Sequence, residues 1–175
     1  VALLAETNPS AQLKAAGAIA CIAAGGHENQ DAVHAAGGVE LLVGLLDETQ
    51  ASMDATKRVN SADIEPGTAA TSHLRELHLR EKVQSQLARA LSELCHGHTG
   101  CQGAIASCGG IKPLIELVEC ADSEHPKEEA AGVLWRLAVA HPNAKSAIAD
   151  QGGIRVLVDF VSKASERGQK MAAGA

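Results

Sequence analysis

Aromatic side chains are almost absent from this sequence, which has one Trp, one Phe and no Tyr among 175 residues. Hydrophobic residues still make up 46% of the chain, so Ala and aliphatic side chains must build any sizeable core. Such a composition suits helices that stack closely. The scarcity of Trp and Tyr also argues against a binding groove built from aromatic hot spots.

Positive charge and long apolar runs are in short supply as well. The sequence has 15 Lys and Arg residues against 21 Asp and Glu residues, a formal net charge of -6. This balance opposes binding to the phosphate backbone of nucleic acids or to an acidic membrane surface. The longest apolar run, 38–46, is far shorter than the ~18 to 20 residues that cross a bilayer. We therefore expect no nucleic-acid partner and no membrane insertion.

The five cysteines are odd in number and scattered through helical patterns, unlike the dense framework of a small disulfide-bonded domain. This usage predicts a reducing, intracellular compartment. The sequence begins without Met or a leader-like segment and ends within a repeated pattern. We therefore expect it to be a segment of a longer protein.

Three glycine pairs reveal an internal repeat, which is the strongest signal in the sequence. The pairs lie in the segments AGGVELLVGLLDE, CGGIKPLIELVEC and QGGIRVLVDFVSK. A second recurring segment, AAGAIACIA, LARALSELC or AAGVLWRLA, precedes each pair, and its third residue is always 20 positions before the first glycine. Outside the longer first repeat, the period is 42 to 43 residues. A period of this length is typical of solenoids with two or three helices per repeat.

The residues of one repeat predict three helices. A short helix ends at the glycine pair, whose backbone can take the positive φ of a sharp turn. A second, amphipathic helix follows, with Ile154, Leu157, Val158 and Val161 on one stripe in the last repeat. A polar loop then leads into a longer third helix. Because each repeat leaves an apolar face for its neighbour to cover, we expect an elongated all-α stack.

These features, and the strings NQDAVHAAGGVELLVGLL and AAGVLWRLAVAHPNAKSAIADQGGIRVLVDF, resemble the armadillo repeat family. HEAT repeats are a less similar alternative, because they usually lack the glycine turn. The resemblance implies a single right-handed α-solenoid over residues 1–175, with about three to four repeats and partial repeats at both ends. Residues 1–6 would be the tail of a second helix, and residues 168–175 the start of a third. The third helices would line a concave groove, where partners bind as extended peptides or as helices.

The groove of this chain departs from one pattern known in the family. Nuclear-import receptors carry a ladder of Trp and Asn on their third helices. At the Trp positions this sequence has Gly17, Arg89 and Gly132, and at the Asn positions it has Cys21, Glu93 and Arg136. The missing ladder argues against import of basic signal peptides. We expect partners to contact Arg89, Glu93, Arg136, Lys14 and Cys21, with Arg167 at the rim.

The first repeat is about 29 residues longer than the others. We place the excess in an exposed loop at 49–72, because this segment is rich in Thr, Ser, Asp and Asn and contains the turn signal Pro66-Gly67. The leucine spacing then predicts an extended third helix at 73–96. A partner-binding role and a passive role for the insertion both stay open.

One cluster has metal-ligand chemistry, since Cys95, His98 and Cys101 could be drawn around a zinc ion. In the repeat register, however, Cys95 takes a position that holds Ala23 and Ala138 elsewhere, so a small buried thiol is the simpler interpretation. No histidine has a plausible pairing of base and nucleophile. We therefore expect no metal, no cofactor and no catalytic site.

The leading hypothesis is a non-catalytic scaffold or adaptor that binds other proteins, as a structural subunit or segment of a larger assembly. By resemblance, cytoskeletal and ciliary scaffolds favour a cytoplasmic or cytoskeletal location, and a nuclear location stays open. Two alternatives remain. One is a peptide-binding module similar to a transport receptor, and the other is a metal-dependent factor built on Cys95, His98 and Cys101.

Overall fold

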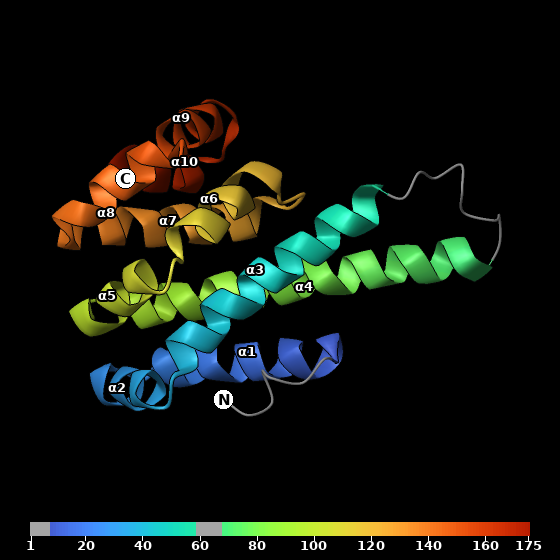
Figure 1. Ribbon diagram of the computed structural model, residues 1–175, viewed down its shortest axis with the longest axis horizontal. Coiled ribbons are helices and arrows are strands. Elements are labelled where there is room, and N and C mark those ends of the chain that lie inside the picture. Colours follow the sequence, from blue (N-terminus) through green and yellow to red (C-terminus); the bar gives the residue numbers. More distant parts are fainter. Residues whose placement is uncertain (1–7, 59–67) are drawn as a thin grey trace.

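The computed structural model describes residues 8–58 and 68–175, and within these ranges the chain forms ten α-helices and no strand (Figure 1). The prediction of an all-α fold is therefore confirmed. The predicted helical tail at residues 1–6 lies outside the described residues. The helices are α1 (Pro9–Ala23), α2 (His27–Ala35), α3 (Gly38–Arg58), α4 (Thr68–Cys95), α5 (Thr99–Ser107), α6 (Ile111–Cys120), α7 (Glu124–Ala140), α8 (Pro142–Asp150), α9 (Gly153–Lys163) and α10 (Glu166–Gly174).

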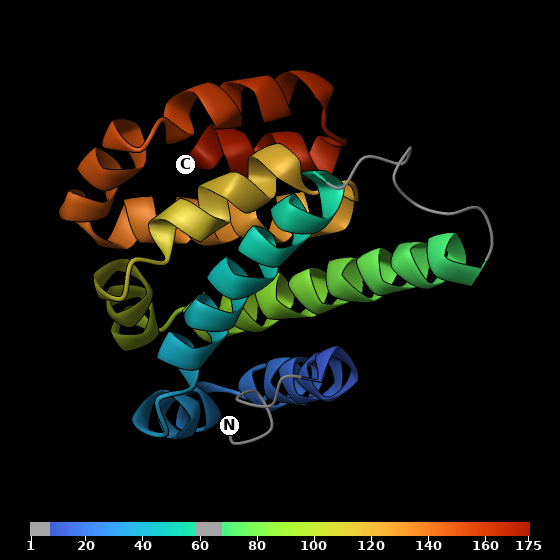
Figure 2. The same cartoon turned by 45° about the vertical axis from the view of Figure 1, so that its right-hand side comes forward.

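The helices repeat in threes and stack in one direction. The short helices α2, α5 and α8 begin each unit, α3, α6 and α9 follow the glycine pairs, and α4, α7 and α10 complete the units. The third helices α1, α4, α7 and α10 lie side by side along the stack, and each contacts the next (Figures 1 and 2). A hydrophobic core of aliphatic and Ala side chains runs through all the units.

The two glycines of each pair have different structural roles. The first glycines, Gly37, Gly109 and Gly152, have φ values of 69°, 84° and 79°. Side chains rarely tolerate this conformation, so the prediction of a positive-φ turn is confirmed. The second glycine allows the two helices to meet, because a Cβ added at Gly110 would lie 2.7 Å from Ile105 Cγ2 and 2.9 Å from the Ile105 carbonyl oxygen. The same crowding recurs at the other two pairs.

The prediction of a loop at 49–72 was wrong over most of its length. Helix α3 continues to Arg58 and helix α4 begins at Thr68, so only 59–67, outside the described residues, lie between them. The polar composition of 49–72 wrongly indicated a loop because polar side chains of this segment form hydrogen bonds within the pair of helices α3 and α4. Gln84 Nε2 donates to Gln50 Oε1 at 2.6 Å, and both side chains are buried. Helix α4 starts five residues before the expected 73.

One end of the stack presents an uncovered apolar surface, which we call the C-terminal end face. It consists of Ile154, Val158 and Val161 on α9 with neighbouring groups of α8 and α10, around a groove of about 430 Å³. Ile154 and Val158 are 59% and 64% exposed. The side chains at the same positions of the two preceding units are buried by the following unit. The C-terminal end face therefore presents the residues that pack against the following unit elsewhere in the chain.

None of the described helices has an apolar stretch long enough to cross a membrane.

Substituting Gly110 by Ala tests the close approach at the glycine pair. The added methyl group meets both Ile105 and Val43 Cγ2, which would be 3.1 Å away, so we expect the free energy of unfolding to fall by about 1–3 kcal/mol. Gly44→Ala is the matched control, because Gly44 lies on the exposed side of α3 with nothing within 4 Å. Relief of backbone entropy should raise the stability of this variant by up to about 1 kcal/mol. Urea unfolding measures both, and equal stabilities would contradict the interpretation.

Candidate protein-binding groove

The surface along the third helices contains a polar pocket between α4, α7 and α10. Its volume is about 260 Å³. Of the groove residues expected from the sequence, it brings together Glu93, Arg136 and Arg167, whereas Lys14, Cys21 and Arg89 do not line it. Lys14 and Cys21 are exposed on α1. The remaining lining residues are Ser92, His96, Glu128, Glu129, Gly132 and Met171.

Arg136 crosses the floor of this pocket without an acidic partner. Its Nη1 donates to Ser92 Oγ at 3.1 Å. The guanidinium also covers Gly132, where an added Cβ would lie 3.4 Å from Arg136 Nη1. No Asp or Glu carboxylate among the described residues approaches Arg136 within the 4.0 Å that defines an ion pair. The guanidinium is only half-buried, so several of its N–H groups remain available to an acceptor from outside.

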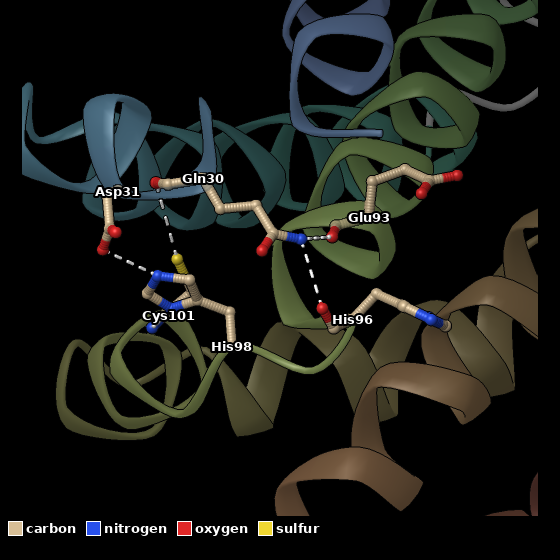
Figure 3. Close-up of polar contacts among 6 residues, drawn as sticks. All are labelled: Gln30, Asp31, Glu93, His96, His98 and Cys101. Carbon is tan, nitrogen blue, oxygen red and sulfur yellow. Dashed lines mark hydrogen bonds and ion pairs between the residues drawn. The ribbon is translucent and has the colours of Figure 1, made fainter. Parts of the chain in front are cut away.

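Glu93 faces the same pocket from α4 and is held there through its backbone. Gln30 Nε2 on α2 donates to the carbonyl oxygens of Glu93 at 2.7 Å and His96 at 3.2 Å. The Glu93 carbonyl belongs to the last turn of α4, whose acceptors have no partner within the helix, and His96 follows directly after the helix end. Figure 3 shows the Glu93 and His96 side chains pointing away from Gln30. The Glu93 carboxylate forms no hydrogen bond or ion pair with any part of the chain that the structure describes.

Two further acids in the pocket share one ionic partner, Arg167. Its guanidinium lies 2.6 Å from Glu129 Oε1 and 3.5 Å from Glu128 Oε2. Glu128 also accepts from the Ser165 hydroxyl. Both carboxylates are almost buried, with side-chain exposures of 10% and 11%, so their pairing with Arg167 offsets the cost of burying charge. Arg167 therefore holds α10 against α7 and is less free than a rim contact would be.

The sequence analysis missed Glu128 and Glu129, although a signal for them was present. They lie four and three residues before Gly132 on a helix, and side chains at these spacings share one face. Once Gly132 was placed in the groove, the same face had to include both acids. Ser92 and His96 follow from the same argument applied to Arg89 and Glu93, each three residues earlier, whereas the participation of Met171 required the structure.

The alternative metal site is not assembled. His98 Nδ1 accepts from the Cys101 backbone N–H at 3.0 Å and so caps the start of α5, while His98 Nε2 meets Asp31 Oδ1 at 2.9 Å (Figure 3). The Cys101 sulfur lies 3.9 Å from the Gln30 carbonyl oxygen. Within 8–58 and 68–175, no group of three or more His, Cys, Asp or Glu residues is placed to hold a metal ion. His98 instead serves as a helix cap that also links two repeats.

The thiols of this region behave as packing groups. Cys95 and Cys101 are both buried. Burial raises the pKa of the Cys95 thiol to about 12 and that of the Cys101 thiol to about 11, because the charged thiolate loses its hydration. The thiolate is the form that binds metals and attacks electrophiles. At neutral pH both groups therefore stay protonated and fill small core positions, as the repeat register indicated.

Comparison with known proteins finds similarity among solved structures. No protein-family model and no curated protein matches the sequence. The crystal structure of one engineered protein has 30% sequence identity and a TM-score of 0.71, over 98% of this chain and 57% of that protein. A second engineered protein has 31% identity and a TM-score of 0.54, over 99% of this chain and 45% of that protein. The chain thus spans about half the length of these two structures.

A structure with a descriptive name points to the same architecture. A designed armadillo repeat protein in complex with the peptide (KR)4 has 21% sequence identity and a TM-score of 0.53, over 99% of this chain and 77% of that protein. At this level of identity the similarity concerns the fold alone. The chain therefore has the armadillo-repeat fold.

His98 provides a test of the junction between the first two repeats. We expect His98→Ala to lower the free energy of unfolding by about 1 kcal/mol, because α5 loses its N-cap acceptor, and to lose the contact with Asp31 as well. His98→Asn should recover part of the loss, since Asn also caps helices well. His96→Ala is the control, because this side chain is exposed. Urea unfolding of the three variants checks the ranking, and an unchanged His98→Ala would refute the capping role.

Proposed function

Because the chain has the armadillo-repeat fold, we propose that it is a non-catalytic protein-binding array that holds an extended segment of a partner along α1, α4, α7 and α10. Proteins with this fold generally bind other proteins or peptides, and two of the similar designed proteins are described by peptide recognition or by a bound peptide. The third helices offer a row of equivalent positions along which a chain can lie.

The observation that carries the proposal is the unpaired charge in the pocket between α4 and α7. Half-buried Glu93 and Arg136 side chains line one 260 Å³ pocket, yet neither has an ionic partner among the described residues. Partly buried charges are unfavourable unless they are paired or hydrogen-bonded. Where such charges serve only to stabilise the fold, they are paired with each other, as Arg167 is with Glu128 and Glu129. A ligand that forms ion pairs with Glu93 and Arg136 would offset the cost of their partial burial, and this would contribute to the free energy of binding.

A second candidate function is that of a structural subunit in a larger assembly, of the cytoskeletal or ciliary kind. In such an assembly the C-terminal end face would be a contact surface, since Ile154 and Val158 occupy positions that neighbouring units cover elsewhere in the chain. In that case the main partner contacts would lie at the end of the stack and the groove would be secondary.

Selection from a random peptide display library, followed by affinity measurements, tests the groove. We expect selected peptides to lose about tenfold or more in affinity, or ~1.4 kcal/mol, for the double variant Glu93→Ala, Arg136→Ala. Arg155→Ala is the matched control, because Arg155 is an exposed cation on α9 outside the pocket. Peptides that ignore the groove variants but fail to bind Val158→Glu would contradict the proposal and favour the assembly role. Circular dichroism confirms that each variant is folded.

A further inference from the structure

The two unpaired charges have opposite signs and occupy equivalent positions of successive repeats. On the assumption that the proposed groove function holds, we propose that the groove selects an extended segment of mixed charge, in which a basic side chain pairs with Glu93 and an acidic side chain pairs with Arg136. Neither the fold nor the similar structures assign this preference.

The first step is that Glu93 and Arg136 do not satisfy each other. Both line the same pocket, but no N–O distance between them is as short as the 4.0 Å of an ion pair. Arg136 is directed elsewhere, since its guanidinium donates to the Ser92 hydroxyl and lies over Gly132. The Gln30 contact holds the Glu93 backbone and leaves its side chain free. The pocket therefore contains a carboxylate and a guanidinium that are not paired with each other.

The second step is the spacing. Glu93 and Arg136 lie at matching positions of α4 and α7, which contact each other along their lengths. Axes of packed helices are roughly 8–10 Å apart, but the Arg136 guanidinium reaches Ser92 on α4, next to Glu93, so the axial distance is an upper limit for the separation of the two charges. An extended chain advances roughly 3.2–3.4 Å per residue. The ligand's basic and acidic residues should therefore be separated by at most about two to three positions.

The third step concerns the other charges near the pocket. Arg167 pairs with both Glu128 and Glu129, but one positive charge against two negative charges leaves this group with a formal charge of -1, which adds to the attraction of Glu93 for a basic side chain. On α1 the equivalent position holds Cys21, which is uncharged at neutral pH. A uniformly basic segment would place positive charge against Arg136, and a uniformly acidic one would place negative charge against Glu93. Only a mixed segment pairs both groups, which are half-buried and therefore weakly screened.

Four labelled peptides of equal length test the preference by fluorescence anisotropy. The first peptide contains Lys and Glu residues that are two or three positions apart, with Lys before Glu in one part of the peptide and Glu before Lys in another. The other three are (KR)4, an all-acidic peptide and a neutral peptide. We expect the mixed peptide to bind about tenfold more tightly than the other three. Equal or tighter binding of (KR)4, or of the acidic peptide, would overturn the inference.

Variants that remove one of the two charges should shift the peptide preference in opposite directions. Arg136→Gln should shift the preference toward (KR)4, because Glu93 is then the only unpaired charge, whereas Glu93→Gln should shift it toward the acidic peptide. Arg155→Gln is the control and should leave the order of affinities unchanged. If groove variants weaken all peptides equally, the charge preference is wrong while groove binding stands. If library-selected peptides ignore the groove altogether, the proposed function itself fails.

Discussion

The architecture depends on the approach of two backbones at the second glycine of each pair. At Gly110 and its equivalents, a helix begins so close to the preceding short helix that a methyl group would overlap a β-branched side chain and a carbonyl oxygen. Because this contact recurs at all three glycine pairs, the second helix begins against the first in the same way in each unit. The apolar faces of successive units can then match, so one continuous core forms almost entirely from aliphatic and Ala side chains.

The same regularity creates the groove. Third helices of equal units must lie side by side, and side chains at equal positions then form rows across them. Backbone acceptors at the helix ends are satisfied by amide side chains from the first helices, since Gln30 reaches α4 and Gln102 donates to the Cys95 carbonyl at 2.7 Å. Both amides hold the end of α4, the helix that carries Glu93. The structural core and the candidate site are thus positioned by one set of contacts.

Sequence reasoning succeeded where residues repeat and failed where they do not. The glycine spacing predicted the turns and the all-α fold, because a repeat supplies its own comparison. The partner-binding role of Glu93 and Arg136 stays a prediction. The segment 49–58 has no equivalent in the other units, and its polar residues were therefore interpreted as a loop although α3 continues through them. Pairing of Arg167 with Glu128 and Glu129 also escaped prediction, since it joins two helices whose relative placement depends on packing.

The buried amide pair between α3 and α4 has a consequence for how this protein can vary. Gln50 and Gln84 complete each other's hydrogen bonding inside the helical hairpin. Replacing one amide alone strands a polar group away from water, which costs about 1–3 kcal/mol, whereas replacing both by apolar groups of similar shape can be nearly neutral. Natural variants should therefore change these two positions jointly. The hairpin of α3 and α4 can gain or lose this buried hydrogen bond only through paired substitution.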